Sequence, residues 1–140
     1  MKSEFFKDKY NLALIGVLLL AFIIRLRYLT INTGFWWDEA EYLNIAKHWI
    51  FNIPLDLNPQ RPPFFPLLIA SLYLVKANIA VIRFITVLIP SFLTVLFTYL
   101  TGKLLYNKKI ALIASFIMSI FWLLIFNTTR VHTDALALFF

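Results

Sequence analysis

The sequence predicts an all-α fold, that of a polytopic helical membrane protein, and three observations support this class. Hydrophobic residues make up 61% of the 140 residues and charged residues only 14%, whereas soluble domains contain roughly 45 to 50% apolar residues. The mean hydropathy is +0.81, and the apolar residues gather in runs long enough for membrane helices. Lysines and arginines flank these runs, as topology signals do. The formal charge of +6 therefore does not indicate nucleic-acid binding, and we expect no nucleic-acid partner.

The first apolar run predicts a membrane-spanning helix over residues 11–29, close to the roughly 20 residues that cross a bilayer. It follows Lys2, Lys7 and Lys9, so it could be the core of a signal peptide. No small-x-small cleavage site follows it, and the run ends in basic residues that begin at Arg25. We therefore expect a retained anchor.

The rest of the chain predicts further spans and two helices at the membrane surface. We expect the second and third spans at residues 81–105 and 109–127, and the start of a truncated fourth span at 135–140. An outer loop is expected over residues 30–80, with interfacial helices at 39–51 and 63–76 within it. The helix at 63–76 has an apolar run of about 14 residues, which gives only roughly 21 Å of helix and favours an interfacial position. Residues 1–140 then form a single transmembrane domain fragment.

This assignment fixes the expected topology. Lys103, Lys108 and Lys109 fall on the same side as the lysine-bearing N-terminus, which agrees with the positive-inside bias. The polar loops then share the opposite face. We expect a multi-pass protein of the cell membrane with its N-terminus inside and its active-site loops outside.

Small residues at three-to-four spacing in the second span predict close helix packing. They are Ser91, Thr94, Thr98, Thr101 and Gly102. Pro90 is expected to kink the same helix.

Asp38 and Glu39 follow the first span and allow two interpretations. Asp38 could be the N-cap of the helix at 39–51, with Glu41 completing a capping box and Trp37 packing on Tyr42. Alternatively, the two carboxylates could do chemistry at the membrane surface.

Arg61 precedes two prolines that begin the second interfacial helix. Its guanidinium could bind two oxygens of a lipid phosphate, or it could only snorkel to lipid headgroups. The basic residues expected to snorkel without a specific role are Arg25, Arg27, Lys76 and Arg83.

Arg130, His132 and Asp134 lie between the third span and the last apolar run, and ionisable groups in such a place suggest a functional site. Asp134 or Thr133 could instead cap the next helix. One histidine does not make a metal site, so His132 alone does not indicate zinc.

Together these clusters resemble the GT-C superfamily of polyprenyl-phosphate-sugar-dependent glycosyltransferases, especially the protein O-mannosyltransferase and aminoarabinose-transferase branch. The matching features are a first helix that ends in arginine, W-D-E at Trp37 to Glu39, a basic residue before Pro-Pro at Arg61, Arg83 opening a helix, a basic turn at Asn107 to Lys109, and R-x-x-x-D from Arg130 to Asp134. Their order and rough spacing agree over nearly the whole chain. Arg61 is a departure, since Lys or His is common there in relatives.

The resemblance implies a GT-C-like set of N-terminal helices with juxtamembrane helices on the outer face, and inverting transfer of a sugar. The donor would be a dolichyl- or undecaprenyl-phosphate sugar held beside membrane lipid, and the acceptor a hydroxyl of a protein or glycolipid. Asp38 would act as catalytic base with Glu39 orienting it or a nearby group, and Arg61 or Arg130 would stabilise the leaving phosphate. Asp134 would hold a divalent cation such as Mg²⁺ or Mn²⁺, alone or together with Asp38, or else orient Arg130 and the acceptor.

Two other classes of protein remain open from the residues. A noncatalytic small membrane subunit or scaffold needs only the caps and interfacial helices. A transporter fragment should carry charged or broken-helix elements near the middle of the membrane, whereas the informative charges here are expected at one face.

Overall fold

The computed structural model describes residues 8–29, 31, 34–55 and 61–139, and within these ranges every regular element is a helix. The all-α prediction is confirmed for this part of the chain. Lys2 and Lys7, parts of the expected outer loop (30, 32–33 and 56–60) and residue 140 lie outside the described residues.

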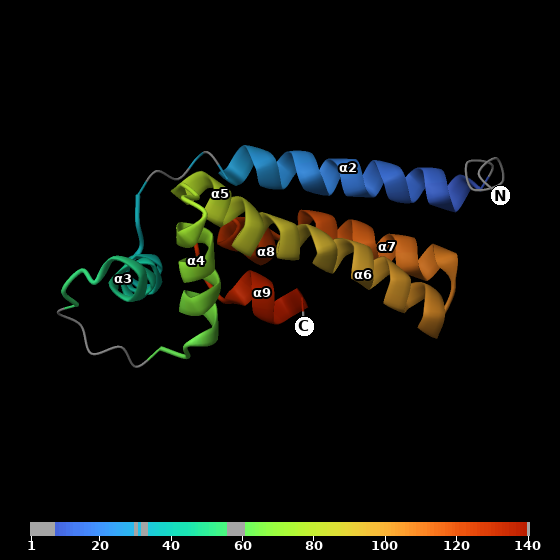
Figure 1. The fold of residues 1–140 in the computed structure, drawn as a ribbon. Coiled ribbons are helices and arrows are strands. Elements are labelled where there is room, and N and C mark those ends of the chain that lie inside the picture. Colours follow the sequence, from blue (N-terminus) through green and yellow to red (C-terminus); the bar gives the residue numbers. More distant parts are fainter. Residues whose placement is uncertain (1–7, 30, 32–33, 56–60, 140) are drawn as a thin grey trace.

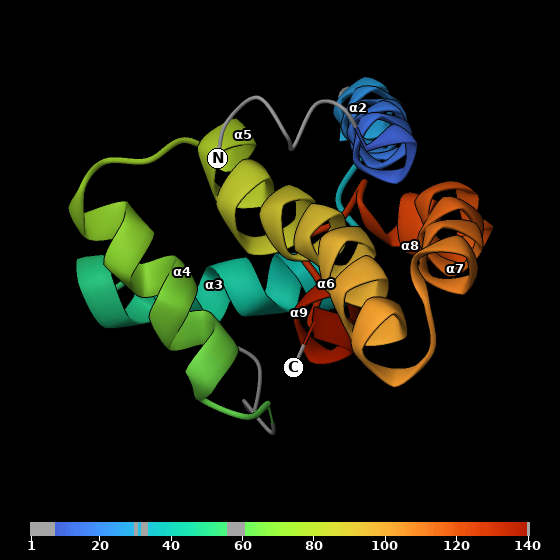
Figure 2. The same cartoon turned by 90° about the vertical axis from the view of Figure 1, so that its right-hand side faces the viewer.

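Three long helices lie side by side in Figure 1: α2 (Lys9–Leu29), α6 (Ile89–Leu105) and α7 (Lys108–Ile120). Two others, α3 (Trp37–Phe51) and α4 (Phe64–Leu74), lie across one end of this bundle, and Figure 2 shows them from the side. They pack on each other through a core that includes Tyr42, Phe65 and Ile69. The two helices predicted to be interfacial therefore do not run along the bundle.

Two helical segments in the described part of the chain are long and apolar enough to cross a membrane, and both lie where the sequence predicted spans. One is α2. The other runs without interruption from Ile79 to Leu105 through α5 (Ile79–Arg83), η1 (Phe84–Leu88) and α6. The element α4, with 11 residues, is shorter.

The segment predicted as one helix over 109–127 is instead two helices. The first, α7, ends at Ile120, and α8 (Trp122–Asn127) follows after Phe121, whose φ of −63° and ψ of 112° are extended. Arg25 fills this break, because its guanidinium donates to the carbonyl oxygens of Ser119 at 3.0 Å and Met118 at 3.4 Å. The last carbonyls of a helix need such partners.

Arg25 also donates from Nε to Ser91 Oγ at 2.7 Å, so one side chain connects α2, α6 and α7. Its side chain is fully buried. The prediction that Arg25 snorkels to the membrane surface is therefore wrong. A buried guanidinium has to be hydrogen-bonded, and the carbonyls at the helix break provide the acceptors.

Pro90 was predicted to kink its helix, and the turn before it is widened into the π-helical segment η1. The N–H of Ile89, the residue after this segment, donates to the carbonyl of Phe84. Proline has no N–H and its ring crowds the preceding turn, which explains the local departure from α-helical bonding.

The helices α6 and α7 approach each other closely at Gly102, as the spacing of small residues in the sequence predicted. A Cβ atom at Gly102 would lie 3.0 Å from the Cα of Ala111. Of the other small residues, Ser91 and Thr94 are buried, whereas Thr101 is exposed.

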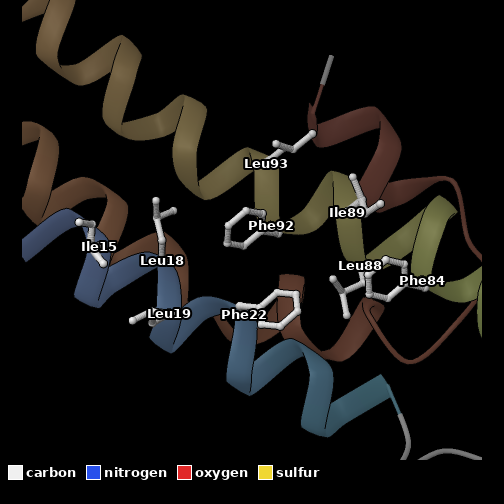
Figure 3. A pocket seen from close by; sticks show the side chains of 9 residues that line it. All are labelled: Ile15, Leu18, Leu19, Phe22, Phe84, Leu88, Ile89, Phe92 and Leu93. Carbon is white, nitrogen blue, oxygen red and sulfur yellow. The ribbon is translucent and has the colours of Figure 1, made fainter. Parts of the chain in front are cut away.

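An apolar groove of about 510 Å³ lies between α2 and the segment formed by η1 and α6. Figure 3 shows its lining side chains, all apolar: Ile15, Leu18, Leu19, Phe22, Phe84, Leu88, Ile89, Phe92 and Leu93. Such a surface suits hydrocarbon rather than water.

The two ends of the bundle carry different groups of ionisable residues. The turn between α6 and α7 lies at the end where α2 begins, and there Lys108 forms an ion pair with Asp8. The Lys108 ammonium lowers the pKa of the Asp8 carboxyl below its usual value. The opposite end, beside α3, carries the acidic residues that the sequence singled out. From there α9 (Asp134–Phe139) returns alongside α6.

Candidate functional site

The first turn of α3 carries both Asp38 and Glu39, where carboxylates interact favourably with the helix dipole. One of the two interpretations from the sequence was that Asp38 is the N-cap. That prediction is wrong, because α3 begins at Trp37 and its N-cap is Trp36, which makes no side-chain cap bond. The Asp38 carboxylate instead binds Arg61.

Arg61 bridges two carboxylates of α3. Its Nη2 donates to Asp38 Oδ1, and its Nε donates to Glu41 Oε2 at 2.6 Å. The guanidinium carbon also lies 5.4 Å from the centre of the Tyr42 ring. The bond to Glu41, with the charge of Asp38, raises the pKa of Arg61 above its ordinary value, which keeps the guanidinium charged. Arg61 therefore lies at the rim of the site with both its partners on α3.

Glu39 is fully buried and connects three parts of the chain. Its Oε1 accepts from Arg83 Nε at 2.9 Å and from the backbone N–H of Val131 at 3.1 Å. The Arg83 guanidinium also lies 5.6 Å from the centre of the Phe35 ring. The prediction that Arg83 only snorkels is wrong, since a buried carboxylate needs this opposite charge.

Arg130 contacts two aromatic rings. Its guanidinium carbon lies 3.2 Å from the centre of the Trp36 ring and 4.1 Å from that of Phe126. Removal from water lowers the pKa of Arg130 below its ordinary value, and the negative charge of Glu39 partly opposes this shift. Cation–π contact compensates part of the lost hydration.

His132 lies between the two aspartates that the sequence placed in separate clusters. Its Nδ1 is 3.0 Å from Asp134 Oδ1, and its Nε2 is 3.4 Å from Asp38 Oδ2. Both contacts lie within ion-pair distance, but Nδ1 makes no aligned hydrogen bond. The other oxygen of Asp134 accepts from Asn127 Nδ2 at 3.1 Å.

These side chains surround one cavity of about 160 Å³. Its lining residues are Trp36, Asp38, Glu39, Asn127, Arg130, His132 and Asp134. At about 30 Å³ per water, the cavity has room for roughly five waters. The structure therefore brings together four of the five predicted site residues, Asp38, Glu39, Arg130 and Asp134, while Arg61 contacts the site through Asp38.

Arg83, Trp36 and Asn127 were not predicted as members of this site, and His132 was assigned no role in it. Arg83 carried a usable signal, because a charged residue near the start of a long apolar helix needs a partner. The positions of Trp36 and Asn127 depend on how α3 and α8 pack, which no local pattern encodes.

Binding of Mg²⁺ or Mn²⁺ between Asp38 and Asp134 stays a prediction. In the described part of the chain, no group of three or more His, Asp or Glu side chains is arranged to hold a metal ion. The imidazole of His132 lies between the two carboxylates. This arrangement does not fit a cation shared by the two carboxylates.

Comparison of the chain with protein-family models, with curated proteins and with solved structures gave no match. Over the described residues, the fold and the site define the class of this protein. It is all-helical, with two helices that are long and apolar enough to cross a membrane. A polar cavity rich in ionisable side chains lies at one end of those helices.

Proposed function

We propose that this chain is a multi-pass membrane glycosyltransferase, or the N-terminal part of one, that uses a polyprenyl-phosphate sugar as donor. One observation carries the proposal. Two pairs of residues far apart in the sequence, Asp38 with Glu39 and Arg130 with Asp134, line the same cavity at one end of the helices. Ionisable residues that converge in a cavity are candidates for catalysis.

The chemistry follows from the carboxylate at the cavity. The acceptor hydroxyl attacks the anomeric carbon of the donor sugar, and Asp38 takes the hydroxyl proton. The bond from this carbon to the lipid phosphate oxygen breaks, and its electron pair leaves with the phosphate. A single displacement of this kind inverts the anomeric configuration.

Arg61 is suited to the leaving phosphate because it lies just before α4, beside the proposed membrane surface. A phosphate would compete with Asp38 and Glu41 for its guanidinium, which binds such oxygens in pairs. If Arg61 turns to the phosphate, the Asp38 oxygen that it now occupies is freed. Donor binding would in this way make this carboxylate accessible to the acceptor hydroxyl.

The orientation we propose puts the cavity on the outer face. Lys108 and its neighbours lie at the opposite end of the bundle, beside the start of α2. The positive-inside bias favours the inner face for that end. The helices α3 and α4 would then lie in the outer interface.

The experiment compares Asp38→Asn with Asp8→Asn in the full-length gene product, with a polyprenyl-phosphate sugar as donor. We expect the Asn variant at position 38 to lose roughly 10²- to 10⁴-fold in turnover. Asp8 lies at the other end of the bundle, so its variant should retain turnover. Turnover near wild type in Asp38→Asn would reduce Asp38 to a structural residue. Preference for a soluble nucleotide sugar would exclude the lipid donor.

A noncatalytic membrane subunit is the second candidate. It is favoured by the ion pairs of Arg61 and Arg83 with carboxylates of α3, because such a network could serve only to hold the helices. In that case Asp38→Asn would change stability or assembly, and no donor would be consumed by the wild-type protein.

A further inference from the structure

His132 has an unusual position, since each of its ring nitrogens faces a different carboxylate. The residue lies on the segment between α8 and α9, and a quarter of its side chain is exposed. Its ring meets that of Tyr42 edge-on, with 6.2 Å between the centres. The imidazole is therefore held between α3 and α9 at the wall of the cavity.

The two contacts of the imidazole differ in length. A neutral imidazole has one N–H donor and one lone pair. We assign the N–H to Nδ1 because its contact with Asp134, at 3.0 Å, is the shorter one, although it is not aligned as a hydrogen bond, and the lone pair of Nε2 then faces Asp38 at 3.4 Å. Alignment of both contacts requires the ring to turn, and contacts of this kind often tighten only when substrate binds.

Asp134 is in turn fixed by Asn127, which donates to its second oxygen at 3.1 Å. Asn127, Asp134 and His132 thus form a chain of contacts that ends at Asp38. A carboxylate that orients an imidazole through Nδ1 leaves Nε2 available as a proton acceptor.

Resting on the transferase function proposed above, we propose that His132 relays the proton that Asp38 removes from the acceptor hydroxyl. The proton passes from the hydroxyl to Asp38 Oδ2 and then to His132 Nε2. Asp38 returns to its ionised form, and the imidazolium donates through Nδ1 to Asp134. No oxidant or further reactant is needed, because the electron pair of the broken glycosidic bond leaves with the phosphate. His132 acts through Asp38 and is a positioning and relay residue.

Charges on every neighbouring element affect this relay. Asp38 and Glu39 face the cavity from α3, Asp134 from α9, and Arg130 from the segment before His132. Arg61 lies behind Asp38 and contacts the same carboxylate from which the proton passes to the imidazole. Histidine is suited to receive it because its ordinary titration falls between pH 5 and 8.

The first test reads the tautomer of His132 without any turnover. Nitrogen-15 NMR of the full-length protein in detergent, at about pH 9 where a histidine is ordinarily neutral, distinguishes a proton on Nδ1 from one on Nε2. His48, whose Nδ1 lies 2.8 Å from the carbonyl of Ile53, is the internal reference. We expect His132 to carry its proton on Nδ1 in the wild type and to lose this preference in Asp134→Asn. A proton on Nε2 in the wild type would overturn the relay.

The second test is the pH dependence of sugar transfer. We expect the wild-type rate to fall in acid, because a protonated His132 cannot take a second proton. His132→Gln should lose this dependence and roughly 10²-fold in rate, whereas His48→Gln should keep both. An unchanged rate and profile in His132→Gln contradicts the relay. Absence of transfer in both the wild type and His48→Gln contradicts the transferase function itself. The role of His132 is decided separately, by the tautomer measurement.

Discussion

Arg83 and Glu39 form a buried ion pair in which Arg83 Nε donates to Glu39 Oε1 at 2.9 Å. Their side chains are 8% and 0% exposed. The same Glu39 oxygen accepts from the N–H of Val131, so the pair also holds the segment between α8 and α9 against α3. The positions of His132 and Arg130 in the cavity wall therefore depend on the ion pair of Glu39 and Arg83, which lies behind that wall.

Removal of one member of this pair should be strongly destabilising. We expect Arg83→Gln to lower the free energy of unfolding by about 3 to 5 kcal/mol, because it leaves the Glu39 charge buried without its cation. The measurement is unfolding in detergent, followed by circular dichroism. Adding Glu39→Gln to Arg83→Gln should cost less than the sum of the single losses. Additive losses would show that the two side chains do not interact.

Arg25→Lys tests the helix break at Phe121. A lysine presents a point charge and cannot reach Ser91 and the two carbonyls together. We expect a loss of about 1 to 3 kcal/mol in the free energy of unfolding. The control is Arg27→Lys, at an exposed position of the same helix, which should change stability little. Equal effects at the two positions would remove the special role of Arg25.

The two glycines of the long helices make a matched pair. Gly102→Ala should destabilise by about 1 to 3 kcal/mol, because the added Cβ would lie 3.0 Å from the Cα of Ala111 and force α6 from α7. A Cβ at Gly16 would meet nothing within 4 Å. Gly16→Ala should therefore raise the free energy of unfolding by roughly 0.5 to 1 kcal/mol, because alanine has less conformational freedom than glycine in the unfolded chain. Thermal unfolding of the two variants should therefore shift in opposite directions.

The ion pair of Asp8 with Lys108 should contribute a small, pH-dependent stability. The folded-state pKa of Asp8 is lowered by Lys108, so the contribution is present above the ordinary aspartate pKa and is lost as the pH falls through the lowered value. Asp8→Asn should be less stable than the wild type at neutral pH, and the difference should vanish in strong acid and shrink in high salt. A difference that persists in strong acid would point to another cause.

Single-cysteine labelling checks the proposed orientation, and the chain has no cysteine of its own. Trp37 and Val75 are 72% and 74% exposed and should label from outside, whereas Tyr106, 69% exposed beside the lysine turn, should not. The reason is the positive-inside bias acting on Lys103, Lys108 and Lys109. Labelling of position 106 together with protection of position 37 would reverse the topology.

Several features could be predicted because they depend on local patterns. The helices α2 and α3 begin within two residues of their predicted starts, because apolar runs and polar boundaries specify them. The close approach at Gly102 followed from small residues at helical spacing. The prediction of one helix over 109–127 was wrong, since the break at Phe121 is stabilised by Arg25 from another helix.

The all-α class, the positions of the long apolar helices, and the acidic and basic residues that could form a site all follow from the amino-acid sequence. Composition and periodicity carry this information, because each helix satisfies its own backbone hydrogen bonds. The partners of the charged side chains emerge only once the chain is folded. Asp38 binds Arg61 instead of capping its helix, and Arg83 is buried against Glu39 instead of reaching the lipid headgroups. Such pairings depend on distances between segments far apart in the chain, which burial fixes once the helices pack.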